Sequence, residues 1–150
     1  MHDLNIVSVN VRGLNSVEKR NIFYKWLEQN NFDVVLLQEI HYVEKFKEKY
    51  DFIWNGISIH NFSDSPYSRG VSILFRKEID VNIINVHRSN DARKLLVNVK
   101  IYDNLITFIN VYAPNNANAR IAFFNRLKSF TTKHSCEGIK MILPQISSGE

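Results

Sequence analysis

The stretch DVVLLQEIH at residues 33–41 decides the fold that this sequence predicts. Four consecutive apolar residues at positions 34–37 run directly into Gln38 and Glu39. A continuous apolar run bounded by polar residues is typical of a strand buried on both faces of a parallel or mixed sheet. An ionised carboxylate beside such a strand is costly unless a partner compensates its charge. Glu39, at the carboxyl end of the predicted strand, therefore needs a partner.

Length and composition indicate one ordinary globular domain. The 150 residues are enough to bury a sizeable core, and 45% of them are hydrophobic. No apolar run approaches the roughly 18 residues that span a bilayer, and the N-terminus lacks a signal-peptide pattern. The single cysteine, Cys136, excludes an internal disulfide framework and suits a reducing compartment. We therefore expect an intracellular protein of the nucleus or cytoplasm, without a membrane partner.

The net charge of +4 and the pI near 9.2 favour polyanionic partners such as DNA. The positive residues are spread along the chain rather than gathered in one run. Charge alone therefore does not identify the partner.

The segments around the opening stretch predict a β-α-β unit. Residues 5–11 alternate, with Val7, Val9 and Val11 on one face of a strand. Ser16 is a suitable N-cap for a helix that ends near residue 30. The apolar stripe predicted for this helix consists of Ile22, Phe23, Trp26 and Leu27. A helical crossover of this length joins two parallel strands.

The rest of the chain predicts further strands and two more helices. Residues 42–50 resemble a short solvated helix, and residues 60–70 form a polar surface loop. The predicted strands cover residues 71–76, 81–87, 95–102, 105–112 and 139–143, with a hairpin turn at residues 103–104. A helix over residues 119–130 carries Phe123, Phe124, Leu127 and Phe130 along one side. This order predicts a layered α/β domain.

Three polar side chains fall at predicted strand ends, where α/β proteins gather their ligand sites: Asn10, Glu39 and Tyr112. Each also has a simpler interpretation. Asn10 could turn the chain before Arg12-Gly13, and Glu39 could be a solvated carboxylate. Tyr112 could be an aromatic residue on a sheet face with its hydroxyl satisfied.

Four ordered blocks connect these residues to a known family. The blocks are IVSVNVRGL (6–14), DVVLLQEIH (33–41), SRGVSILF (68–75) and FINVYAP (108–114). Together they resemble the endonuclease/exonuclease/phosphatase superfamily, and in particular the apurinic-endonuclease-like domain of non-LTR (LINE-type) retrotransposons. The QE-x-H form of the second block and the RGVSIL motif favour this branch over the sphingomyelinase and inositol-phosphatase branches. The resemblance spans residues 4–143 and implies a four-layer α/β sandwich.

The resemblance also implies roles for individual residues. Glu39 matches the family's Mg²⁺ ligand, and Asn10 matches the residue that helps to position metal and phosphate. Tyr112 matches a tyrosine that contacts the scissile phosphate or assists the attack. His41 matches a histidine near the DNA-facing rim, and Arg69 lies in a loop that could reach the phosphate backbone or point into solvent.

The family's later Gly-Asp-x-Asn and Ser-Asp-His blocks have no counterpart here. The last predicted strand is followed by PQISSGE, and no aspartate occurs after Asp103. We therefore expect residues 1–143 to be the N-terminal part of such a domain and residues 144–150 to be a divergent tail. In this incomplete sandwich the first sheet and its helices are largely present and the second half is missing. Its uncovered inner face would favour self-association.

The function expected from the sequence is a truncated Mg²⁺-dependent endonuclease of LINE type. It would nick DNA in its complete form and be inactive alone, because catalytic groups that act together lose most of their effect when one is missing. Two alternatives stay open. One is a non-catalytic nucleic-acid-binding module, and the other is a different phosphoesterase of the superfamily that acts on a lipid or inositol phosphate.

Overall fold

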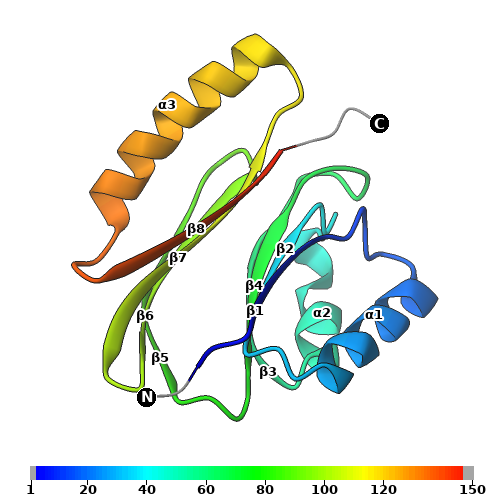
Figure 1. Cartoon of the computed structure of the whole chain (residues 1–150). Coiled ribbons are helices and arrows are strands. Elements are labelled where there is room, and N and C mark those ends of the chain that lie inside the picture. Colours follow the sequence, from blue (N-terminus) through cyan, green and yellow to red (C-terminus); the bar gives the residue numbers. More distant parts are fainter. Residues whose placement is uncertain (1–2, 147–150) are drawn as a thin grey trace.

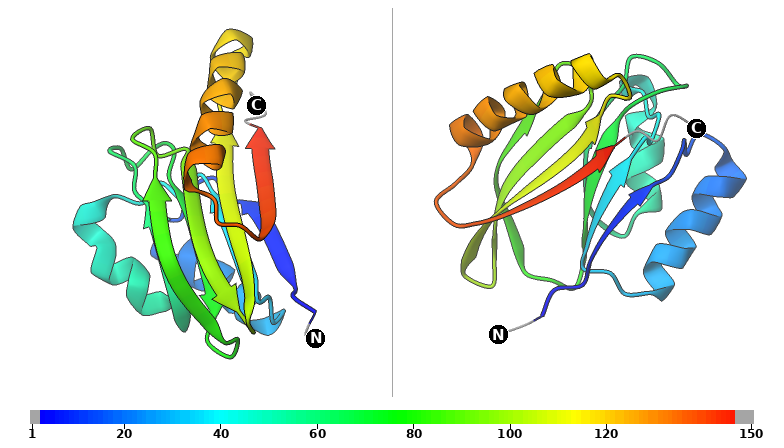
Figure 2. Two further views of the ribbon diagram at one scale, coloured as in Figure 1. Left: turned by 90° about the vertical axis from the view of Figure 1, so that its left-hand side faces the viewer. Right: turned by 45° about the horizontal axis from the view of Figure 1, so that its top comes forward.

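The computed structural model describes residues 3–146 and contains two four-stranded sheets with helices on their outer sides (Figure 1). The first sheet has the order β1 (Ile6–Asn10), β2 (Val34–Gln38), β4 (Val71–Arg76), β3 (Gly56–Asn61). The second has the order β5 (Val81–Arg88), β6 (Lys94–Ile101), β7 (Asn104–Ala113), β8 (Ile139–Ile146). Helices α1 (Val17–Gln29) and α2 (Lys47–Ile53) lie outside the first sheet. A short 3₁₀ helix, η1 (Glu44–Phe46), directly precedes α2. Helix α3 (Ala117–His134) lies outside the second sheet (Figures 1 and 2).

The predicted β-α-β unit is confirmed. Strands β1 and β2 pair in parallel, with Ile6 beside Val34 and Asn10 beside Gln38. Ser16 caps α1 by accepting a hydrogen bond from Lys19 N. The alternation in β1 also has the predicted effect, because Val7 and Val9 pack in the cluster under α1 while Ile6 packs between the sheets.

The predicted apolar stripe of α1 is partly wrong. Ile22 is 71% exposed and Trp26 is 42% exposed, whereas Arg20, Tyr24 and Leu27 are buried. The polar members of this inner face have buried partners, which lowers the cost of their burial. The hydroxyls of Tyr24 and Tyr42 lie 3.1 Å apart, and Arg20 Nη1 donates to the backbone oxygen of Leu14 at 3.0 Å.

Several element boundaries also differ from the predictions. Strand β3 (Gly56–Asn61) was not predicted, and it includes the first two residues assigned to the surface loop. The hairpin turn lies at residues 102–103, because Tyr102 and Asp103 have positive φ angles of 47° and 73° and Ile101 pairs with Asn104. Helix α3 is longer than predicted. It buries Phe123 and Leu127 but leaves Phe124 exposed. Strand β8 runs past the predicted boundary at residue 143, while residues 147–150 of the predicted tail lie outside the described residues.

The predicted α/β sandwich is confirmed, but the expectation of an uncovered inner face is wrong. Strands β5 to β8 form a second sheet, and its apolar face packs directly on the first sheet. The rings of Phe75 on β4 and Phe108 on β7 meet edge to face, with their centroids 5.8 Å apart. Strands β5 to β8 therefore supply the opposing layer, and self-association through that face no longer follows.

Within residues 3–146, none of the helices is long and apolar enough to cross a membrane.

Candidate functional site

The candidate residues lie where the ends of several strands meet at one edge of the sandwich. Because β1 and β2 are parallel, Asn10 and Gln38 end them side by side, and Glu39 follows directly. Strand β4 is antiparallel to β2, so Val71 begins beside Gln38 and the preceding Arg69-Gly70 loop reaches the same edge. Tyr112 lies at the end of β7 in the second sheet.

Backbone hydrogen bonds run along this edge, and one of them, from Gly70 N to Ala92 O, joins the segments of the two sheets. The bonds run from Gly13 N to Glu39 O (2.6 Å), Ile40 N to Gly70 O (3.1 Å), Gly70 N to Ala92 O (3.1 Å) and Tyr112 N to Arg93 O (2.9 Å). The site is therefore built on a continuous backbone scaffold rather than on isolated loops.

The same edge concentrates strained backbone. Five non-glycine residues here have positive φ angles between 51° and 61°: Arg12, Glu39, His41, Arg69 and Ala92. Each such conformation costs about 1 kcal/mol or more for an L-residue. Residues with strained backbone cluster at ligand-binding and active sites.

A buried amide pair joins the sheets directly beneath the site. Gln38 Nε2 donates to Asn110 Oδ1 at 2.8 Å, and Asn110 Nδ2 donates to the backbone oxygens of Leu37 and Ser72 at 2.9 and 2.8 Å. Both amide side chains are fully buried. These bonds fix the carboxyl end of β2, and with it the start of the Glu39 segment, against β7.

Glu39 is partly exposed and lies next to His41. Its side chain is 23% exposed, and Oε1 lies 3.9 Å from His41 Nε2. Among the side chains that the structure describes, none donates a hydrogen bond to this carboxylate, so its oxygens are available to a ligand. The His41 ring packs against Gly13, where a Cβ atom would lie only 2.6 Å from Nδ1. Burial lowers the pKa of His41 and outweighs the opposing charge of Glu39.

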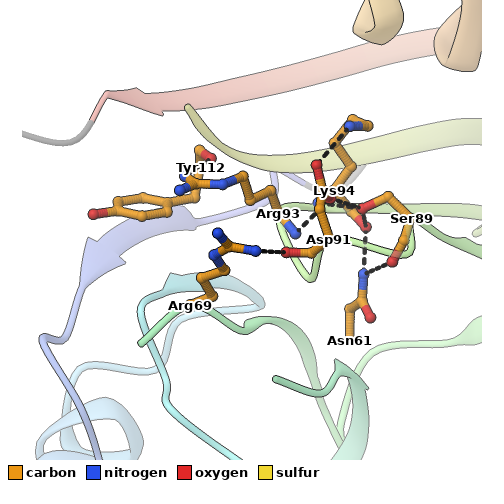
Figure 3. Close-up of polar contacts among 7 residues, drawn as sticks. All are labelled: Asn61, Arg69, Ser89, Asp91, Arg93, Lys94 and Tyr112. Carbon is orange, nitrogen blue, oxygen red and sulfur yellow. Dashed lines mark hydrogen bonds and ion pairs between the residues drawn. The ribbon is translucent and has the colours of Figure 1, made fainter. Parts of the chain in front are cut away.

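Arg93 holds Tyr112 in place (Figure 3). Its Nη1 donates to the backbone oxygen of Tyr112 at 3.0 Å, and the guanidinium carbon lies 5.3 Å from the centre of the Tyr112 ring. Arg69 Nη1 donates to the backbone oxygen of Asp91 at 3.5 Å. Burial, and then the charge of Arg69, lower the pKa of Arg93, while Asp91, Tyr112 and Glu39 act in the opposite direction. Arg69 and Glu39 thus both act electrostatically on Arg93.

Asn10 closes the turn after β1. Its Oδ1 accepts a hydrogen bond from Arg12 N at 3.1 Å, which is the turn-forming role that the sequence allowed for it. The amide nitrogen takes no part in this bond. The contact is therefore compatible with both interpretations of Asn10.

The donor set at Glu39 fits Mg²⁺ better than Zn²⁺. No group of three His, Cys, Asp or Glu side chains that could hold a metal occurs among the described residues. Zinc sites need such a group, whereas Mg²⁺ is commonly bound by one or two carboxylates together with water and substrate phosphate. The partly exposed Glu39 carboxylate, at an edge that also carries Arg69 and Arg93, fits the second arrangement.

The sequence did not identify Arg93 or Asn110 as part of this edge. Arg93 precedes β6 and resembles any charged residue before a strand. Asn110 gave a usable signal, because it is an amide within the otherwise apolar run of β7. Its partner, Gln38, is 72 positions away, so the pairing could not be read from local pattern.

Comparisons with known proteins agree with this geometry. Residues 7–135 match the model of the endonuclease/exonuclease/phosphatase family. The Transposon TX1 uncharacterized 149 kDa protein of Xenopus laevis is 24% identical over 127 residues, which are 85% of this chain and 10% of that protein. This relative agrees with the predicted retrotransposon branch.

Solved structures share the fold at low sequence identity. An AP endonuclease from Archaeoglobus fulgidus has a TM-score of 0.68 and 21% identity, over 95% of this chain and 56% of that one. The mannosyl-6-phosphatase Bt3783 of Bacteroides thetaiotaomicron has a TM-score of 0.70 and 13% identity, over 95% and 64%. The chain thus spans less than two thirds of each of these relatives. The family match covers most of the chain, and the protein belongs to the endonuclease/exonuclease/phosphatase family.

Proposed function

We propose that this chain carries the metal- and phosphate-binding part of a Mg²⁺-dependent phosphodiesterase site of LINE type. In a complete domain the site nicks DNA, whereas the chain alone binds DNA without appreciable turnover. The observation that carries the proposal is the partly exposed Glu39 carboxylate, which lies at the shared strand edge and acts electrostatically on Arg93.

The arrangement suits the charge changes of phosphodiester hydrolysis. When bound, Mg²⁺ supplies Lewis-acid polarisation of a phosphate oxygen. Glu39 holds the cation, and Asn10 lies at the neighbouring strand end. The positive charge of Arg69 and Arg93 attracts the phosphate backbone of the substrate, and Arg93 fixes Tyr112 at the same edge.

Three residues that could act as a base, Asp91, His41 and His134, are poorly suited to activate an attacking water. The Asp91 carboxylate is already bonded to Ser89, and burial lowers the pKa of His41, which makes its neutral imidazole a weaker base. His134, the last residue of α3, stacks on His87 of β5 with 3.9 Å between the ring centroids. This poor suitability supports low turnover and favours a non-catalytic nucleic-acid-binding module as the second candidate.

DNA is the proposed substrate because of the basic net charge and the arginines at the site. Action on DNA would place the protein in the nucleus or cytoplasm.

Two assays on the same preparations test the proposal: nicking of supercoiled plasmid in Mg²⁺ or EDTA, and fluorescence anisotropy with a labelled DNA duplex at low salt. The variants are Glu39→Gln and, as a matched control, Glu137→Gln, which removes an exposed acid beyond α3. We expect DNA binding that Mg²⁺ tightens in the wild type and in the control but not in Glu39→Gln, with nicking at background.

The outcomes separate the parts of the proposal. EDTA-sensitive nicking that Glu39→Gln abolishes would contradict the proposed lack of turnover but would support Glu39 as the metal ligand. An identical Mg²⁺ effect in Glu39→Gln would overturn the metal site. No DNA binding at low salt would remove DNA as the partner.

A further inference from the structure

Two guanidinium groups face the same space beside Tyr112 without a carboxylate of their own (Figure 3). Arg93 comes directly before β6, and Arg69 belongs to the loop before β4, so the two arginines come from different sheets. Among the described residues, their side chains donate only to backbone oxygens, those of Tyr112 and Asp91. Within the described part of the chain, neither arginine therefore forms an ion pair with a carboxylate.

The nearby carboxylate of Asp91 already has hydrogen-bonding partners other than the two guanidinium groups. Its Oδ1 accepts hydrogen bonds from Ser89 Oγ at 2.6 Å and from Arg93 N at 3.1 Å, and Oδ2 lies 3.4 Å from Lys94 Nζ. Burial opposes ionisation of Asp91, but these donors outweigh it and hold the pKa of the carboxyl below its usual value. The Asp91 carboxylate therefore holds the loop together and makes no hydrogen bond with either guanidinium group.

Holding two like charges together costs free energy unless an anion is available to bind both. The effect of Arg69 on Arg93 exceeds that of any single opposing charge nearby, including Asp91 and Glu39. A tetrahedral oxyanion suits this space, because planar guanidinium groups donate paired hydrogen bonds to phosphate oxygens.

We propose that Arg69 and Arg93 together form a binding site for one backbone phosphate of a nucleic acid, adjoining the phosphate held at Glu39. The inference rests on the proposed function for the identity of the ligand. Because Arg93 also holds the ring and backbone of Tyr112, a phosphate bound there would further fix Tyr112 beside the reacting phosphate.

The test measures duplex DNA binding by anisotropy across a salt series, in EDTA so that metal binding at Glu39 does not contribute. The variants are Arg69→Gln, Arg93→Gln, the double variant and Arg93→Lys, with thermal unfolding to verify folding. Arg126→Gln is the charge-matched control, because Arg126 is exposed on α3.

Each glutamine variant is expected to weaken binding about tenfold, as for loss of a charge-assisted hydrogen bond. The salt slope of the double variant is expected to fall by about 0.9, the value for one phosphate on B-DNA. Arg93→Lys keeps the charge and is expected to retain the slope while binding more weakly than the wild type. A fall of about 1.8 in the double variant would indicate two separate phosphates and overturn the paired site. Losses equal to those of Arg126→Gln would overturn it as well.

Inorganic phosphate separates this inference from the proposed function. Phosphate, compared with chloride at equal ionic strength, is expected to raise the melting temperature of the wild type but not of the double variant. A wild type that responds to phosphate but does not bind DNA would sink the proposed function and support the paired anion site. The wild type could bind DNA and respond to Mg²⁺ while the double variant matches it in both the DNA-binding and the phosphate-melting assays. That result would refute the paired site alone.

Discussion

Asn110→Ala removes the amide that joins the two sheets directly beneath the candidate site. The change deletes two donated hydrogen bonds, to the oxygens of Leu37 and Ser72, and one accepted from Gln38 Nε2. All three contacts are buried, and each buried polar group left without its partner costs about 1–3 kcal/mol. We therefore expect the free energy of unfolding to fall by about 3 kcal/mol or more. That is a large share of the roughly 5–15 kcal/mol typical of a folded domain.

Urea unfolding followed by tryptophan fluorescence measures this loss. The matched control is Asn104→Ala at the hairpin, where the amide makes one exposed contact with Tyr102 O at 3.4 Å. That control is expected to change the unfolding free energy by less than about 0.5 kcal/mol. If Asn110→Ala cost less than about 1 kcal/mol, the buried amide would not be what fixes the end of β2 against β7.

Three further predictions concern the frame around the site. Gly13→Ala is expected to lower stability by about 1–2 kcal/mol, because φ is +89° and the new Cβ would meet His41 Nδ1; an unchanged melting temperature would contradict this. Burial lowers the pKa of His60 to about 4, so the native state resists a proton that the unfolded chain accepts. Stability is thus fully present above about pH 6.5 and falls by about 2–3 kcal/mol as the pH drops towards 4; a His60→Gln variant with the same pH dependence in urea unfolding would refute this. Asp33→Asn is expected to cost about 1–3 kcal/mol, because the buried carboxylate accepts from Arg76 Nε at 3.0 Å, and an unchanged urea midpoint would rule it out.

The first β-α-β unit could be predicted from local sequence patterns alone. The strict alternation of β1, the Ser16 N-cap and the apolar run of β2 predicted the first β-α-β unit with its parallel pairing. The same unit placed Asn10 and Glu39 at neighbouring strand ends. Tyr112 followed from the resemblance to the family, and the structure places it on the facing sheet at the same edge.

Long-range contacts explain what the sequence could not predict. The inner face of α1 is decided by partners of Tyr24 and Arg20 elsewhere in the chain, which override the apolar stripe. The second sheet covers the first because β5 to β8 pack across the core, and strand patterns alone do not say which sheets face each other. Arg93 became a candidate only when the fold placed it beside Tyr112 and Arg69.

Binding of Mn²⁺ in place of Mg²⁺, followed by electron paramagnetic resonance in the presence of a DNA duplex, tests the central role of Glu39 most directly. The wild type is expected to bind one Mn²⁺ that Mg²⁺ displaces, because a single available carboxylate and a substrate phosphate suit a hard cation. Glu39→Gln is expected to weaken this binding about tenfold or more, while Glu137→Gln leaves it unchanged. Equal Mn²⁺ affinity in Glu39→Gln and the wild type would contradict the assignment of Glu39 as the metal ligand.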